Sequence, residues 1–240
     1  MCGRFALSIT PARFRDLFGC PPPAGYAARW NIAPDSEVPV IRSGPEGVRE
    51  AVWMRWGLLG SWMRDPRDPG RQINARLETA ADKPMFRAAF RRRRCLVPAD
   101  GFYEWRKRRR GASQPHFVRL GEGAPMAMAG IWQATRLADG SLHESFAILT
   151  RPACPAIREI HHRMPVLVPP ERWDAWLDPE PRDARLLREL LECGPMAVEA
   201  RPVSRRVNSP ANDDPELPAP VEEEAEERNP APAPVQGSLF

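Results

Sequence analysis

The sequence predicts an α+β fold with a mainly antiparallel sheet, followed by an unstructured tail. Short β-like runs are spread through the first 207 residues and are separated by turn-forming residues. A few helical segments interrupt these runs, and this mixture is typical of the α+β class. Beyond residue 207, prolines and acidic residues replace the apolar runs. We therefore expect one domain over 1–207 and a disordered tail over 208–240.

The first expected elements are a strand and a short helix. FALSI, residues 5–9, predicts the strand, and PARFRDLF, residues 11–18, predicts the helix. Thr10 is suited to the N-cap of this helix, and a proline occupies its first turn. VPVIR, residues 38–42, predicts the next strand, and KPMFRAAFRRR, residues 83–93, predicts the second helix.

Strands dominate the second half of the expected domain. RCLVPA, residues 94–99, and FYEWRK, residues 102–107, flank the turn dipeptide Asp100-Gly101. The apolar residues of 181–192 fall on one face of a helix. The remaining expected elements are strands at 116–120, 126–136, 145–151 and 196–204, and helices at 169–177 and 181–192.

Composition restricts the class of protein. With 42% hydrophobic residues in 240, the chain can bury a substantial core. It has no apolar run long enough to span a membrane and no basic-then-apolar signal pattern, so we expect a cytoplasmic protein without membrane contact. Its five cysteines are scattered and form no CxxC pair, and its four histidines are not spaced as metal ligands. This predicts reduced thiols, no metal site and no cofactor.

Charge separates the two expected parts. The tail has eight acidic residues and one basic residue, a net charge of −7, which leaves +11 on residues 1–207. A body with this charge suggests a polyanionic partner such as nucleic acid. A solvated basic surface with no partner would have the same composition.

Cys2 is the first residue with a chemical signal, because it follows the initiator methionine. A small second residue generally permits removal of Met1, which would make Cys2 the N-terminal residue. The α-amine, with a reference pKa of ~7.7–8.0, and the thiol, with one of ~8.5, would then both be nucleophiles near neutral pH. An incidental cysteine at a frayed terminus is the alternative.

Polar residues stand inside three apolar or β-like segments. Asn74 lies in INARLET, Glu104 in RCLVPADGFYEW, and His161 and His162 in IHHRMP. Together with Cys2 they supply a nucleophile, a carboxylic acid or base, an imidazole and an orienting amide. Each also has a structural alternative: Asn74 as a helix cap, Glu104 as a surface ion-pair partner, and the histidine as an ordinary structural residue.

Several motifs together resemble the SRAP family, the SOS-response-associated peptidases, which are also regarded as abasic-site processing proteins. The motifs are MCGRF, WNIAP, RWGL, INARLET, RCLVPADGFYEW, AGIW, AILT and HHRMP, and they occur in the family's order from Cys2 to roughly Pro202. The resemblance implies one SRAP-type domain with a barrel-like sheet and flanking helices.

The resemblance also implies a reaction with abasic single-stranded DNA. In the family, an N-terminal cysteine attacks the aldehyde of an opened abasic sugar, and the thiol closes a thiazolidine ring. Cys2 matches this cysteine, Asn74 the orienting amide, Glu104 the acid or base, and His161 the histidine of the H-x-R-M-P motif. The family usually has an acid where this chain has His162, so the choice between the two imidazoles stays open.

Two further sets of residues concern binding. Arg4 and Arg76 match family positions that grip DNA phosphates, and the guanidinium fork suits that role. The C-terminal residues Gln236, Leu239 and Phe240 resemble the Gln-x-x-Leu-Phe peptide that binds the bacterial sliding clamp. The expected partners are therefore abasic single-stranded DNA and the clamp, for a monomer associated with the nucleoid.

Two other functions fit parts of the sequence. Glutamine amidohydrolases of the N-terminal nucleophile class also begin with Met-Cys-Gly, and their cysteine forms a thioester. None of their glutaminase pocket motifs is found in this chain, and an arginine-rich surface has no obvious use there. The second alternative is a non-catalytic DNA-binding module with an interaction tail, for which Cys2 would be dispensable.

Overall fold

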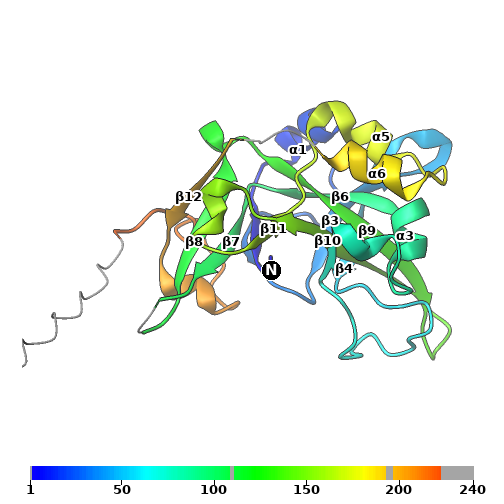
Figure 1. The fold of residues 1–240 in the computed structure, drawn as a ribbon, viewed down its shortest axis with the longest axis horizontal. Helices are drawn as coiled ribbons and strands as arrows, with labels where there is room; N and C mark the ends of the chain where they lie inside the picture. Colours follow the sequence, from blue (N-terminus) through cyan, green and yellow to red (C-terminus); the bar gives the residue numbers. More distant parts are fainter. Residues whose placement is uncertain (1, 109–110, 193–196, 223–240) are drawn as a thin grey trace, which may run out of the picture.

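A closed five-stranded barrel forms the larger part of the fold (Figure 1). The computed structural model describes residues 2–108, 111–192 and 197–222. The barrel strands, in the order of their pairing, are β10 (Leu142–Pro152), β4 (Arg49–Trp56), β3 (Glu37–Ser43), β6 (Arg94–Ala99) and β9 (Met126–Arg136). The barrel closes because β9 also pairs with β10, from Leu142 opposite Arg136 to Ile148 opposite Gly130.

A second sheet lies beside the barrel. Its strands, in pairing order, are β12 (Val198–Pro202), β8 (Gln114–Leu120), β7 (Gly101–Arg106), β1 (Phe5–Leu7) and β2 (Arg29–Ile32). The chain passes from the barrel into this sheet at Asp100, between β6 and β7. Asp100 Oδ2 accepts hydrogen bonds from the backbone N–H and the hydroxyl of Ser8, at 2.6 and 2.7 Å. These two hydrogen bonds hold the end of β1 against the turn that connects the two sheets.

Two short strands extend the barrel at the end of β10. β5 (Asn74–Arg76) pairs with β10 in parallel, with Asn74 opposite Ile148. β11 (Arg163–Pro165) pairs with β10 antiparallel, with Arg163 opposite Pro152. The last five residues of β10 therefore hold two segments that are far apart in the sequence.

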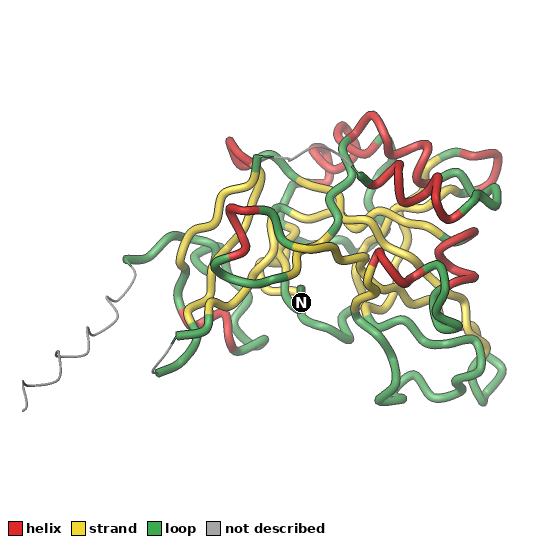
Figure 2. Tube along the Cα trace, in the orientation of Figure 1, coloured by secondary structure: helices red, strands yellow, loops and turns green. Residues whose placement is uncertain are grey.

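The helices are short and gather mainly on one side of the barrel, as Figure 2 shows in red. Tryptophans anchor this layer: the Trp173 ring stacks on Phe18 at 5.1 Å, and Trp176 Nε1 donates to the Cys95 carbonyl at 2.9 Å. The α-helices are α1 (Pro11–Phe18), α2 (Leu77–Ala80), α3 (Arg87–Arg92), α4 (Pro155–Arg158), α5 (Trp173–Leu177) and α6 (Ala184–Leu191). The 3₁₀ turns are η1 (Pro45–Gly47), η2 (Gly121–Gly123), η3 (Pro170–Arg172) and η4 (Arg205–Asn208). Among the described residues, no helix is long and apolar enough to cross a bilayer.

The expected fold class is confirmed, with differences in detail. Thr10 caps α1 by accepting a hydrogen bond from the Arg13 N–H. The helix expected over 83–93 is shorter and starts at Arg87, because the residues before it form turns. Strands β2, β4, β5 and β11 were not expected. Two pairings of β10, with β4 and β5, are parallel, whereas the other pairings between the described strands are antiparallel.

Residues 208–222 are ordered, so the prediction of a disordered tail is wrong for this segment. Leu217 is fully buried there, in a small apolar cluster with Tyr103 and Val207. Asp213 accepts hydrogen bonds from the backbone N–H groups of Trp30 and Asn31, at 2.5 and 3.0 Å. A few specific contacts hold a segment whose average composition is typical of disorder. Residues 223–240, including the expected clamp motif, lie outside the described residues.

The contacts of Asp213 predict a measurable contribution to stability. In an Asp213→Ala variant, two backbone N–H groups of β2 lose their acceptor, and Arg29 loses its ion-pair partner at 3.1 Å. We expect the free energy of unfolding to fall by about 1–3 kcal/mol. Thermal unfolding of this variant should be compared with Glu216→Gln, which changes an exposed ion-pair partner in the same segment. Equal midpoints for both variants would contradict a stabilising role for Asp213.

Candidate functional site at the junction of the two sheets

Cys2 lies just before β1, and its side chain is completely buried. The Sγ atom is 3.9 Å from the carbonyl oxygen of Arg4. Burial raises the pKa of the Cys2 thiol well above its ordinary value, and the charge of Glu104 raises it further. The thiol is therefore protonated near neutral pH, and any reaction that uses it as a nucleophile needs a nearby base.

Asn74 fixes the main chain of Cys2. Its Nδ2 donates to the Cys2 carbonyl oxygen at 2.7 Å, and the side chain is 8% exposed. The preceding residue, Ile73, accepts hydrogen bonds from Trp56 Nε1 and from the N–H of Ile148, which hold β5 in place. Within the described chain, Asn74 Oδ1 is buried without a hydrogen-bond partner. Asn74 therefore orients Cys2 and leaves one acceptor available to a bound group.

Glu104 lies on β7 and is 3% exposed. Burial raises the pKa of Glu104 to about 7, although the positive charge of the chain's amino group opposes the shift. The charge of Glu104 acts on the Cys2 thiol, so the two side chains are close enough to interact. A carboxyl group with this pKa exchanges its proton near neutrality, as a general acid or base requires.

His161 follows α4 and precedes β11, and its Nδ1 is 3.9 Å from Glu104 Oε1. Burial lowers the pKa of His161, which favours the neutral imidazole. His162 stacks on His161 with ring centroids 4.4 Å apart, but it is exposed, and its pKa is lowered mainly by the neighbouring His161. The geometry thus brings His161, rather than His162, to Glu104.

The two arginines expected at phosphates have different surroundings. Arg4 Nη1 donates to Asn31 Oδ1 at 2.8 Å and to the Val207 carbonyl at 2.7 Å, and partial burial lowers the pKa of Arg4. Arg4 therefore also ties the segment after β12 to the N-terminal strand. Arg76 ends β5, two residues after Asn74, and its side chain is exposed. A grip on DNA phosphates stays a prediction for both residues.

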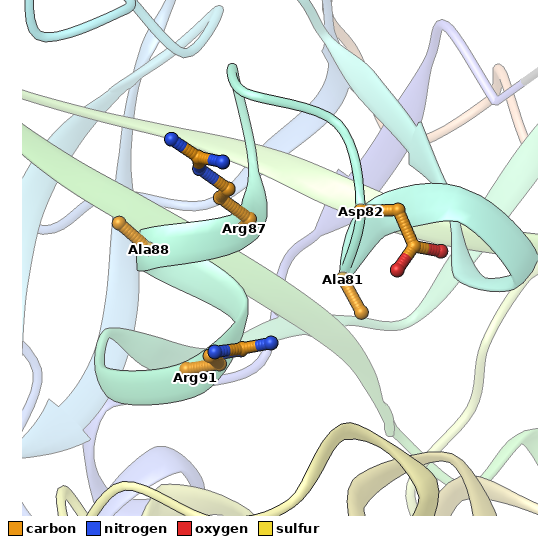
Figure 3. Close-up of a pocket in the computed structure, with 5 residues that line it drawn as sticks. All are labelled: Ala81, Asp82, Arg87, Ala88 and Arg91. Carbon is orange, nitrogen blue, oxygen red and sulfur yellow. The ribbon is translucent and has the colours of Figure 1, made fainter.

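A surface hollow between α2 and α3 carries further arginines (Figure 3). It has a volume of about 470 Å³, and Figure 3 shows Arg87 and Arg91 projecting from α3 and Asp82 from the turn after α2. Asp82 pairs with Arg188 at 3.2 Å. Among the ion pairs of the described residues, none includes Arg87 or Arg91, so this surface has excess positive charge.

Sequence reasoning did not assign roles to two residues that border the site. Arg163 and Glu78 form an ion pair at 2.6 Å, and Arg163 is 8% exposed. Arg163 lies in the motif HHRMP and Glu78 in INARLET. An arginine is rarely buried without an acidic partner, so an arginine and a glutamate inside these two motifs were the signal that could have predicted the ion pair. Among the residues that the structure describes, no cluster of three or more His, Cys, Asp or Glu side chains is placed to hold a metal ion.

Comparisons with known proteins identify the family of the chain. The model of the family "SOS response associated peptidase (SRAP)" matches residues 1–210. The chain is 33% identical over 221 residues to abasic site processing protein YoqW of Bacillus subtilis, covering 90% of this chain and 98% of that protein. It is 32% identical to abasic site processing protein YedK of Escherichia coli, with 92% and 100% covered. It is 30% identical to abasic site processing protein HMCES of Gallus gallus, with 92% and 78% covered.

Solved structures share the fold. A protein from Bacteroides thetaiotaomicron superposes with a TM-score of 0.81 at 24% identity, covering 92% of this chain and all of that one. A protein from Bordetella bronchiseptica superposes with a TM-score of 0.74 at 29% identity, covering 85% and 100%. With the family model matched across nearly the whole described chain, these similarities lead to one conclusion: the chain belongs to the SRAP family.

Proposed function

We propose that this protein processes abasic sites in single-stranded DNA by forming a covalent thiazolidine crosslink through Cys2 after removal of Met1. The observation that carries the proposal is the convergence of four polar side chains from separate segments on the junction between the sheets. Asn74 binds the Cys2 carbonyl at 2.7 Å, and His161 Nδ1 is 3.9 Å from Glu104 Oε1. The relatives named abasic site processing proteins support the choice of substrate.

The first step joins the amine of Cys2 to the opened abasic sugar. Once Met1 is removed, the α-amine attacks the aldehyde carbon, and loss of one water gives a Schiff base. Asn74 holds the main chain of Cys2 while this bond forms. Glu104 or His161 protonates the departing hydroxyl, and general acid catalysis of this kind needs a proton donor within reach of the site.

The second step closes the five-membered ring. Sγ of Cys2 adds to the Schiff-base carbon, the nitrogen gains a proton, and the thiol loses one, so no external reactant is consumed. Burial keeps the thiol protonated until this step, because it raises the thiol pKa. Glu104, with a pKa of about 7, is the base that we assign to the thiol proton. The same carboxyl group and His161 would assist the hydrolysis that removes Met1.

DNA binding is assigned to the basic surface around this site. Arg76 is exposed two residues after Asn74, and Arg87 and Arg91 add positive charge along the same stretch of chain. Phosphates neutralised by arginines supply sequence-independent affinity, which suits a lesion that has no base to read. We assign the protein to the cytoplasm, in association with the nucleoid, and we expect it to act as a monomer.

The role of Cys2 predicts how its variants react. We expect the wild-type chain to lose Met1 by intact-mass analysis and to give a shifted band with abasic single-stranded DNA on a denaturing gel. Cys2→Ala cannot close the ring, so it should give no stable adduct, and Cys2→Ser should give a weaker or reversible one. Cys20→Ala removes another buried thiol and is the matched control, with a normal adduct.

An equally strong adduct from Cys2→Ala would refute the proposal and favour a DNA-binding module in which Cys2 is dispensable. Hydrolysis of glutamine by the wild-type chain, without any DNA adduct, would instead favour the amidohydrolase alternative. The two results are separable because one is read on DNA and the other as released ammonia.

The raised pKa of Glu104 predicts a pH dependence. Because this pKa is about 7, the carboxylate fraction increases as the pH rises through neutrality, and the rate of ring closure should increase with it. Glu104→Gln should slow adduct formation by about 10²–10⁴-fold and remove this limb of the pH profile. The pH profile of this variant should then show only the titration of the α-amine, at ~7.7–8.0. Single-turnover rates measured on gels across neutral pH provide the check.

The two histidines give an internal control for the same experiment. His161→Ala should slow adduct formation while leaving affinity for intact single strands nearly unchanged, because we assign His161 to proton transfer beside Glu104 and assign DNA binding to the arginines. His162→Ala should react at the wild-type rate, because His162 is exposed, stacks on His161 and has no assigned role in proton transfer. A slow His162 variant with a normal His161 variant would reverse the assignment.

We also propose that Gln236, Leu239 and Phe240 dock on the bacterial sliding clamp. Their support is the sequence: an acidic, proline-rich stretch ends in two large apolar residues. Attachment of the chain to the clamp through these residues would raise the local concentration of the domain near newly exposed abasic sites. Purified clamp should retain the full chain in a pull-down but not a chain that ends at Val235. Both chains should crosslink DNA equally, and equal clamp retention would refute this role.

A further inference from the structure

The side chain of Arg163 is held near the site by several hydrogen bonds. Its Nη1 and Nη2 donate to the two carboxylate oxygens of Glu78 at 2.6 and 2.9 Å. Nη2 also donates to the Thr150 carbonyl oxygen at 2.6 Å, and the residue is 8% exposed. A two-point contact between a guanidinium and a carboxylate fixes orientation as well as distance.

These contacts join three segments that build the site. Glu78 belongs to α2, which follows directly after the strand that contains Asn74. Thr150 lies on β10, opposite Arg76 of that strand. Arg163 begins β11, two residues after His161. The guanidinium therefore fixes the segment of His161 relative to the segment of Asn74.

The main chain of Arg163 acts directly on the imidazole. Its N–H donates to Nδ1 of His161 at 3.0 Å, and its carbonyl oxygen is also 3.0 Å from the same nitrogen. Neutral Nδ1 can accept from the N–H, and protonated Nδ1 can donate to the carbonyl oxygen. The ring thus has a hydrogen-bond partner in both protonation states without turning, which reduces the reorganisation that accompanies proton transfer.

We propose that Glu78 and Arg163 are positioning residues for His161. Their ion pair holds the Arg163 main chain in the position where its N–H bonds to neutral Nδ1 and its carbonyl oxygen bonds to protonated Nδ1. The ion pair thereby also keeps the His161 ring beside Glu104. This inference rests on the proposed function, because it assigns the pair to the same proton transfers. An ion pair that served stability alone would leave the chemistry of His161 unchanged.

Several charged or titratable groups surround His161, and a test of the ion pair must leave them unchanged. Glu104 faces the ring from β7, His162 stacks on it, and Lys107 and the chain's amino group act on its pKa, as does Arg163 itself. Glu78 contacts Arg163 and not the ring, so removing its charge changes the support of His161 and leaves these neighbours in place.

The experiment compares Glu78→Gln and Arg163→Lys with Glu50→Gln. Glu50 pairs with Arg42 at 2.7 Å on β3 and β4, so it is a matched ion-pair loss away from the site. At saturating abasic single-stranded DNA we expect Glu78→Gln and Arg163→Lys to crosslink about 10- to 100-fold more slowly, as for a misplaced catalytic group. Half-saturating DNA concentration and affinity for intact single strands should stay near the wild-type values. Glu50→Gln should crosslink at the wild-type rate.

A second measurement reports on His161 itself. The ¹⁵N shifts of its imidazole should change in folded Glu78→Gln, because the Nδ1 hydrogen bonds weaken, and should stay unchanged in Glu50→Gln. Wild-type rates together with unchanged shifts in Glu78→Gln would overturn the inference. If the wild-type chain formed no adduct at all, the proposed function would fail, while the ¹⁵N comparison would still support or refute the positioning of His161.

Discussion

Strand β10 is the constraint on which the rest of the structure depends. Its eleven residues close the barrel through β9 and β4 and then continue to hold β5 and β11. Asn74 and the segment of His161 are thus positioned by one continuous backbone, although they are distant in sequence. A shift of one residue in this register would move every side chain of the shifted strand to the opposite face of the sheet. The same pairing that stabilises the barrel therefore also sets the geometry of the site.

The electrostatics of the junction follow from burial. Burial raises the pKa of the Cys2 thiol, raises that of Glu104 to about 7 and lowers that of His161. Each shift moves its group toward the neutral form, because a low-dielectric environment disfavours isolated charge. The site therefore contains nearly neutral groups that can exchange protons with one another. The ion pair of Glu78 and Arg163 stands at its border, where the carboxylate is half exposed and the charge is compensated.

The sequence predicted the parts of the fold that depend on local signals. The helix at Pro11–Phe18 follows from Thr10 and its proline, and the strands on either side of Asp100 follow from apolar runs around a turn. Strand β4 was missed because REAVWMRW mixes charged residues into a strand whose environment depends on distant partners. The parallel pairings of β10 are also tertiary and leave no local pattern.

For the candidate site, the sequence predicted which residues take part but not how they contact one another. The family motifs predict roles for Cys2, Asn74, Glu104 and one of two histidines. Only the fold shows that Asn74 holds the Cys2 carbonyl and that His161, rather than His162, approaches Glu104. The order of 208–222 could not be inferred from composition. It depends on single contacts of Asp213 and Leu217, which an average over the segment does not detect.

The tie between the two ends of the described chain has a consequence for folding. Arg4 donates to the Val207 carbonyl, and Asp213 binds the backbone of Trp30 and Asn31. Contacts of such long sequence separation carry a large loop-closure entropy cost, which slows folding. During synthesis, these contacts of β1 and β2 cannot form before residues 207 and 213 have left the ribosome. The N-terminal strands therefore complete their native contacts only when nearly the whole described chain has been synthesised.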